Sequence, residues 1–137
     1  MRVVLDTNIL VSSLISPAGH PATIYDAWQD GKFTLLICTE HLAELRATLQ
    51  KPRIAKLIKP HRAGRLVNQV KELAEEISRL PRVKRSPDPN DDFLLALSEA
   101  GNADYLVTGD KSGLLSLERH KSTQILTARK FAALLAN

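Results

Sequence analysis

The chain of 137 residues is basic, with 19 lysines and arginines against 15 aspartates and glutamates. Its 44% hydrophobic and 25% charged residues are typical of a globular protein, and its length predicts one domain over residues 1–137. No apolar run is long enough to span a membrane, nothing at the amino end resembles a signal peptide, and there is one cysteine. We therefore expect a cytoplasmic protein without disulfides and without membrane association.

The net charge of +4 favours a polyanionic partner, although charge alone does not identify one. Aromatic residues make up only 4% of the chain, which argues against a base-stacking platform of the kind that single-strand-binding proteins use. The histidines show no metal-ligand spacing, and the sequence contains no phosphate-binding glycine loop, zinc pattern or Ser/His/Asp arrangement. The function must therefore be sought in other side chains.

The first half of the chain alternates short apolar runs with segments of helical periodicity. In chain order we expect a strand ending at Asp6, a short helical segment from Ile9 to Leu14, a helix from Pro21 to Gly31, a strand from Phe33 to Cys38, a helix from its cap Thr39 to Pro52, and a helix carrying Leu66, Val70, Leu73 and Ile77. The two strands are continuously apolar, which is typical of strands that are buried on both faces.

The second half continues this alternation after a loop from Leu80 to Asn90 that is rich in proline and basic residues. We expect a helix from Asp91 to Ala100, a strand from Tyr105 to Thr108, a strand from Thr123 to Leu126 and a closing helix capped by Thr127. Strands that alternate with helices form βαβ units. The sequence therefore predicts a three-layer α/β/α fold with a mostly parallel central sheet.

Four acidic residues lie where strand ends or helix starts would bring them toward one edge of this sheet. Asp6 ends the first strand, and Asp110 follows the strand Tyr105–Thr108. Glu44 lies in the helix after the second strand, and Asp92 lies in the first turn of a later helix. Because ligands bind at the carboxyl ends of the strands in open α/β sheets, this placement predicts a shared site.

The chemistry of such a site follows from its residue types. Clustered carboxylates repel one another, so a cation is expected to share their site. Oxygen ligands without histidine or cysteine suit Mg²⁺ or Mn²⁺. Such an ion polarises a phosphate and lowers the pKa of a bound water, which can attack phosphorus in line. The pattern therefore predicts metal-assisted hydrolysis of phosphodiester bonds without a protein nucleophile.

Each acid also has a purely structural interpretation. Asp6 could cap the helix that follows it, and Asp110 could be an ordinary turn residue. Glu44 could be a solvated residue of an amphipathic helix, and Glu40, one turn earlier, could take the same role. Asp91 and Asp92 both lie at a helix start, where acids interact favourably with the helix dipole. The functional interpretation therefore depends on the joint placement of the four acids.

These residues resemble the PIN domain family over essentially the whole chain. The resemblance is carried by the run Val3–Asn8, the helix with Glu44, the helix from Asp92 and the run Tyr105–Asp110. It is strongest toward a bacterial and archaeal branch of toxin components similar to VapC toxins. The resemblance implies a PIN-like fold and a Mg²⁺- or Mn²⁺-dependent ribonuclease. It also implies an RNA substrate, a homodimer and a cognate antitoxin that inhibits the protein.

The resemblance also implies roles for individual residues. The catalytic and metal-binding acids of the family match Asp6, Glu44, Asp92 and Asp110. Asp92 is chosen over Asp91 because of its distance from Thr108 and because Ala96 follows it by one helical turn.

Polar residues around the four acids match supporting positions of the family. Asn8 and Thr108 stand where side chains commonly support the site through hydrogen bonds. Ser112 departs from the pattern, because many relatives carry an aspartate at this position. Serine is a poorer metal ligand than aspartate, so this departure affects the binding of a second metal ion or the affinity for the first.

Basic residues near the acids are candidates for contact with nucleic acid. A strand that enters a carboxylate site needs positive flanks to offset phosphate repulsion. The candidates are Lys111, Arg85, Lys51 and Arg53. The alternative interpretation is that they belong to solvated helix and loop surfaces.

Two other functions are compatible with the same residues. The first is a PIN-fold nuclease that processes RNA or acts on DNA structures. The second is a PIN-like binding module that has lost catalysis, with Ser112 as the suggestive defect. The presence of all four acids argues against this second function.

Overall fold

A six-stranded sheet in the order β3-β2-β1-β4-β6-β5 forms the centre of the fold. The computed structural model describes residues 1–110 and 112–137. The strands are β1 (Arg2–Leu5), β2 (Thr34–Ile37), β3 (Glu75–Glu76), β4 (Tyr105–Val107), β5 (Arg119–His120) and β6 (Thr123–Leu126). All pairs are parallel except β5 with β6. The predicted mostly parallel sheet is therefore confirmed.

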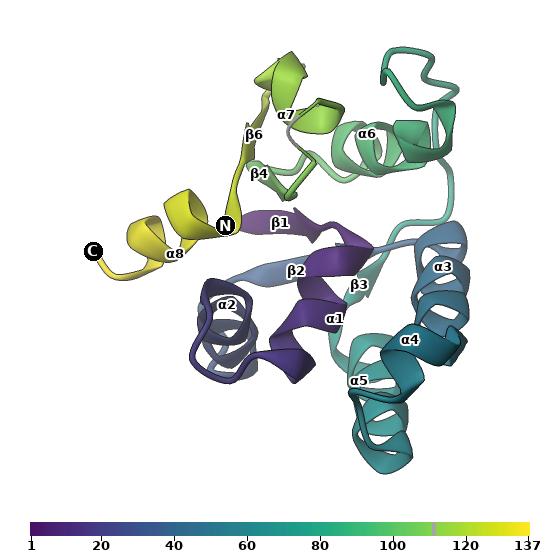
Figure 1. Ribbon diagram of the computed structural model, residues 1–137. Helices are drawn as coiled ribbons and strands as arrows, with labels where there is room; N and C mark the ends of the chain where they lie inside the picture. The colour runs from purple at the N-terminus through teal and green to yellow at the C-terminus, as the bar shows by residue number, and fades with distance from the viewer. Residues whose placement is uncertain (111) are drawn as a thin grey trace.

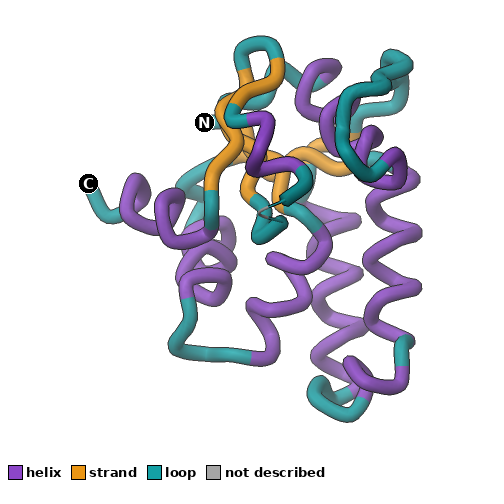
Figure 2. The backbone as a smooth tube through the Cα atoms, turned by 45° about the horizontal axis from the view of Figure 1, so that its top comes forward, coloured by secondary structure: helices purple, strands orange, loops and turns teal. Residues whose placement is uncertain are grey.

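Helices cover both faces of this sheet (Figures 1 and 2). They are α1 (Thr7–Ile15), α2 (His20–Gln29), α3 (Thr39–Gln50), α4 (Pro52–Ala55), α5 (Pro60–Leu73), the 3₁₀ helix η1 (Pro89–Asp91), α6 (Asp92–Ala100), α7 (Leu114–Leu117) and α8 (Ala128–Leu135). In Figure 1, α6 and α7 lie on one side of the sheet, and α1, α2 and α5 lie on the other. The three-layer α/β/α prediction is confirmed.

The apolar strand residues divide between the two faces because successive side chains of a strand point in opposite directions. Val3 and Leu5 belong to the core under α1, α2, α5 and α8. Val4 belongs to the second core, with Leu106 of β4 and Leu94 of α6. Burial on both faces explains why β1 and β2 read as continuous apolar runs rather than alternating ones.

The structure differs from the predicted elements in two places at the start of the chain. Thr7 already begins α1, two residues before the predicted start at Ile9, and Thr39 is the first residue of α3 rather than its cap. In both cases the helix starts directly at the end of a strand. The strand-to-helix connections are therefore shorter than predicted.

The helix predicted to reach Ile77 ends at Leu73, and β3 follows it. Glu75 accepts hydrogen bonds from the Arg2 guanidinium of β1 at 3.0 and 2.5 Å, and the N–H of Ile77 donates to the carbonyl of Ile37 at 2.9 Å. These contacts join residues that are far apart in the sequence. Local helical periodicity at Ile77 therefore gave way to pairing with the sheet.

The carboxyl edge of the sheet is set by the register of its three central strands. Leu5 pairs with Val107, and Val107 pairs with Leu126. The residues that follow these three, namely Asp6, Thr108 and Thr127, therefore share one edge. Within the described residues, no helix is both long enough and apolar enough to cross a membrane.

Candidate metal-binding site

A cavity of about 590 Å³ opens at this carboxyl edge, and five carboxylates line it. They come from the end of β1, from α3, from the approach to α6 and from the exit of β4, and they are Asp6, Glu44, Asp88, Asp91 and Asp110. We call this the acidic cavity. The sheet topology thus brings together acids that are far apart in the sequence.

Asp6 is the most buried of these acids, with 8% of its surface exposed. Its Oδ2 accepts a hydrogen bond from the hydroxyl of Thr108 at 2.7 Å, and the same hydroxyl accepts one from the N–H of Asp110 at 3.2 Å. The Asp6 side chain makes no capping hydrogen bond to α1. The capping interpretation of Asp6 is therefore not what the structure presents.

The electrostatic surroundings of Asp6 disfavour its ionised form. Burial raises the pKa of the Asp6 carboxyl above its ordinary value, and the charges of Glu44 and Asp110 raise it further. The hydrogen bond from Thr108 acts in the opposite direction but does not cancel these effects. A cation in the cavity would relieve this repulsion.

Glu44 faces the acidic cavity from α3 rather than lying free on a solvated surface. Its Oε1 accepts a hydrogen bond from the hydroxyl of Thr7, the first residue of α1. This contact ties α3 to the end of β1, next to Asp6. Thr7 thus holds Glu44 in the same way that Thr108 holds Asp6.

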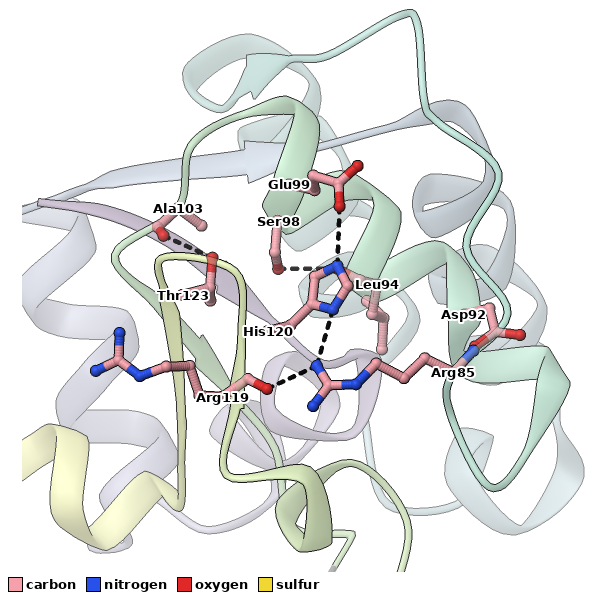
Figure 3. Close-up of polar contacts among 9 residues, drawn as sticks. All are labelled: Arg85, Asp92, Leu94, Ser98, Glu99, Ala103, Arg119, His120 and Thr123. Carbon is pink, nitrogen blue, oxygen red and sulfur yellow. Dashed lines mark hydrogen bonds and ion pairs between the residues drawn. The ribbon is translucent and has the colours of Figure 1, made fainter.

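Asp92 does not line the acidic cavity, and the structure places Asp91 there instead. Oδ1 of Asp92 accepts hydrogen bonds from the backbone N–H groups of Arg85 and Ser86 at 3.1 and 2.7 Å. Figure 3 draws Asp92 and Arg85. The sequence-based choice of Asp92 differs from the structure for a physical reason. The 3₁₀ turn η1 precedes α6, and it directs Asp91 toward the cavity and Asp92 toward the preceding loop.

Asp91 is coupled electrostatically to the other acids. Burial, together with the charges of Asp6, Asp88, Asp110 and Glu44, raises the pKa of Asp91 to about 6. This coupling is consistent with the position of Asp91 in the cavity lining.

Asp110 is held by the turn that follows it. Its Oδ1 accepts a hydrogen bond from the N–H of Gly113 at 3.1 Å. A β-carbon at Gly113 would lie 1.8 Å from Oδ2 of Asp110, so a larger residue here would have to displace this carboxylate. Ser112 is exposed and is not part of the cavity lining.

The predicted nucleic-acid contacts do not form one group. Lys51 lines the acidic cavity, whereas Arg53 is an exposed residue of α4 outside that lining. Nη1 of Arg85 donates to the backbone carbonyl of Arg119 at 2.7 Å, so Arg85 has a structural contact of its own. Lys111 lies outside the described residues.

The cavity also contains polar residues that the sequence interpretation did not assign. Asn8 lines it as expected, and the unassigned residues are Thr7, Ser12, Thr48, Asp88 and Asp91. Ser12 and Thr48 carry no distinctive local signal. Thr7 and Asp88 did carry a local signal. Thr7 stands beside Asp6, and Asp88 belongs to the run Asp88–Asp92, which holds three acids.

The donor set fits a hard divalent cation by its chemistry, because all five acidic ligands offer carboxylate oxygens. Among the described residues, no three of the acids lie close enough together to hold a metal ion as they stand. Asp6 and Asp110 instead direct oxygens to Thr108 and Gly113. Binding of a cation would therefore have to draw these side chains together.

A mostly parallel sheet with an acidic cavity at its carboxyl edge defines an α/β domain suited to divalent cations and phosphate chemistry. The PIN domain model matches residues 2–112. The chain therefore belongs to the PIN domain family, which is generally a family of nucleases that depend on divalent metals. None of the curated proteins matches the chain.

Two solved structures share the fold. PAE2754 from Pyrobaculum aerophilum superposes with a TM-score of 0.65 at 17% identity, over 99% of this chain and 90% of that one. VapBC2 from Rickettsia felis, bound to a DNA fragment from its promoter, gives a TM-score of 0.56 at 20% identity, over 93% of this chain and 98% of that one. At these identities, the similarity establishes the fold.

Proposed function

We propose that the protein is a metal-dependent endoribonuclease that hydrolyses phosphodiester bonds of RNA in the acidic cavity. The observation that carries this proposal is the convergence of five carboxylates from four segments on one cavity at the sheet edge. The raised pKa values of Asp6 and Asp91 support it, because they indicate repulsion that a bound cation would relieve. Membership of the PIN domain family supports nuclease chemistry.

Asp6, Glu44, Asp91 and Asp110 are the residues that we propose to hold Mg²⁺ or Mn²⁺, with Asp91 taking the role first given to Asp92. When bound, the ion supplies Lewis-acid polarisation of the phosphate and lowers the pKa of a bound water. Asp88 lines the same cavity and adds negative charge.

The residues of the chain orient this site and balance its charge. The hydroxyls of Thr108 and Thr7 both donate to carboxylates, so they fix Asp6 and Glu44. Among the described residues of the cavity lining, Lys51 is the cationic side chain. Its ammonium group is suited to offset the charge of an incoming phosphate.

We further propose that this nuclease is the toxin of a toxin–antitoxin pair, acting in the cytoplasm as a homodimer with a cognate antitoxin. The PIN family and the fold shared with VapBC2 support this biological role. Co-expression tests it directly. The chain alone should arrest growth, and the product of a neighbouring antitoxin-like reading frame should relieve the arrest and co-purify with it. Growth arrest that no neighbouring gene relieves would contradict the pairing.

A cleavage assay over a panel of cellular RNAs, with Mg²⁺, with Mn²⁺ and with EDTA, tests the enzymatic proposal. We expect metal-dependent cleavage at internal positions of one or more RNAs. Cleavage that persists unchanged in EDTA would contradict the metal requirement. Failure to cleave any RNA in either metal would favour a binding module without catalysis.

A further inference from the structure

A second and larger cavity, of about 1090 Å³, lies beside β5 and β6. Its lining includes four cationic side chains, Arg85, Arg119, Lys121 and Lys130. The acidic side chain in the lining is Glu118. We call this the basic cavity, and its charge is opposite to that of the acidic cavity.

The positive charge of the basic cavity is not neutralised by the protein itself. In the described part of the chain, Arg119, Lys121 and Lys130 form no ion pair. All three are exposed, so their charges face solvent. Unpaired cations around a concave surface favour the binding of an anion.

One wall of the basic cavity is fixed by a partly buried hydrogen-bond network (Figure 3). Nη1 of Arg85 contacts Nδ1 of His120 at 3.0 Å, and Nε2 of His120 contacts Oε1 of Glu99 at 3.1 Å. Because a guanidinium can only donate, Nδ1 of His120 accepts and its Nε2–H donates to Glu99. Asp92 holds the backbone of Arg85, which gives this acid a role in the wall of the basic cavity.

The basic cavity reaches the carboxyl edge of the sheet at Thr127 and extends from there along β6 toward the turn at Lys121. Thr127 lines the basic cavity and follows β6, just as Asp6 lines the acidic cavity and follows β1. Since β4 alone separates these strands and neighbouring strands lie about 4.8 Å apart, the two residues are on the order of 10 Å apart along the edge. A single polymer chain could therefore occupy both cavities.

We propose that the basic cavity binds backbone phosphates of the RNA strand whose scissile phosphate enters the acidic cavity. This inference rests on the proposed ribonuclease function and adds the path of the substrate. An RNA strand carries a phosphate at every nucleotide, so a strand seated at the acidic cavity presents further phosphates to the neighbouring cations. An acidic peptide, by contrast, carries no phosphodiester on which the acidic cavity could act, so nothing would draw it from one cavity to the other.

The test compares two triple variants with the same loss of charge. The first, Arg119→Gln/Lys121→Asn/Lys130→Gln, removes the exposed cations of the basic cavity. Asparagine is chosen at position 121 because Lys121 has a φ of 53°, a conformation that asparagine tolerates. The control removes three exposed cations that line neither cavity, through Lys32→Gln/Lys71→Gln/Arg79→Gln.

Binding of a fluorescein-labelled single-stranded RNA is measured by anisotropy in EDTA at several KCl concentrations, so that binding is separated from cleavage. The cavity variant should bind about tenfold or more weakly than the wild type. Its slope of log K against log salt should be smaller by about 2, since each phosphate contact to a single strand contributes about 0.7. The control variant should stay close to the wild type.

Equal weakening in the two variants would overturn the proposal, as would a wild type that does not bind RNA. Displacement of the RNA by polyglutamate at equal charge would also overturn it, in favour of an acidic peptide. A wild type that binds with the expected slope but cleaves no RNA in Mg²⁺ or Mn²⁺ would support the role of the basic cavity and contradict the ribonuclease function.

Discussion

Asp6 and Glu44 are each held by a threonine that an adjacent strand or helix supplies. Thr108 donates to Asp6 from the end of β4, and Thr7 donates to Glu44 from the start of α1. Both hydroxyls therefore serve to orient carboxylates at the cavity. Carboxylates held in this way are suited to bind a cation that activates water for attack on the substrate.

Another residue with an unusual environment is His41 of α3, which is fully buried. Neither ring nitrogen has a hydrogen-bond partner among the described residues. The ring packs edge-on against Phe93, with 5.7 Å between the ring centroids. Burial lowers the pKa of His41 to about 4, from an ordinary value of 6.5. In the unfolded chain, this histidine takes up a proton near pH 6.5, whereas the folded protein resists protonation until about pH 4.

We therefore predict that His41 makes the protein less stable as the pH falls from 6.5 toward 4. The unfolded state binds the proton first, so the loss approaches about 3 kcal/mol across this range. His41→Leu should remove this component while retaining an apolar side chain against Phe93. Urea unfolding of the wild type and His41→Leu in EDTA at pH 8, 6 and 4 measures this component. An identical pH dependence of the free energy of unfolding in the two proteins would contradict the prediction.

At the scale of elements, the short turn η1 decides which acid reaches the acidic cavity. Asp91 ends η1 and lines the cavity, whereas Asp92 begins α6 and binds the backbone of Arg85 and Ser86. The two neighbouring residues therefore have separable roles. A matched pair of substitutions can distinguish them.

We predict that Asp91→Asn lowers metal-dependent cleavage by at least about 100-fold. Loss of a residue that only supports a metal ligand costs about 10- to 100-fold, and Asp91 is proposed to bind the metal directly. Asp92→Asn should leave cleavage close to that of the wild type, because the asparagine carbonyl can still accept the two backbone hydrogen bonds. Rates at saturating Mn²⁺ measure both effects. A larger loss in Asp92→Asn than in Asp91→Asn would reverse the assignment.

Asp91→Asn should also change the stability of the folded protein in the absence of metal. The pKa of Asp91 is raised in the folded protein, so its charged form destabilises the fold above about pH 6, and this effect disappears as the pH falls toward 4. In EDTA at pH 8, Asp91→Asn should therefore be more stable than the wild type, by about 1 kcal/mol after allowance for solvent screening. Lower stability of Asp91→Asn at pH 8 would contradict this sign.

The sequence predicted the longer elements well and the shorter ones poorly, for physical reasons. Apolar runs and helical periodicity were sufficient for β1, β2, β4, β6 and the major helices, because burial alone produces these patterns. β3 was missed because it depends on contacts with Arg2 and Ile37. β5 was missed because its turn places Lys121 at a φ of 53°, without the glycine or asparagine that usually marks such turns.

At the scale of the whole molecule, parallel topology concentrates acidic residues at one edge of the sheet, and the basic cavity begins at the same edge, at Thr127. Asp6, Glu44 and Asp110 could be brought together from sequence because strand ends in a parallel sheet meet at one edge. Asp91 and the basic cavity could not, because they depend on the 3₁₀ turn and on the side-chain network around His120. The sequence presents Asp91 and Asp92 side by side without deciding between them, and no local pattern marks the basic cavity.

A cation that binds only the folded protein should stabilise the whole molecule. At a free metal concentration 100 times Kd, the gain is about 2.7 kcal/mol, which corresponds to a rise in Tm of about 10 °C for a chain of this size. Thermal unfolding in increasing Mg²⁺ or Mn²⁺ measures this effect. The shift should shrink in Asp6→Asn, and the absence of any shift at millimolar metal in the wild type would favour a module that has lost its metal site.

The most direct test of the acidic cavity as a nuclease centre is cleavage of single-stranded RNA by Asp6→Asn in Mn²⁺. The substitution removes one charge, and the asparagine carbonyl can still accept the hydrogen bond from Thr108. Circular dichroism in EDTA should therefore match that of the folded wild type, and the variant should still unfold in one cooperative thermal transition. We predict that cleavage is abolished in this variant, whereas undiminished cleavage would contradict the assignment of the site.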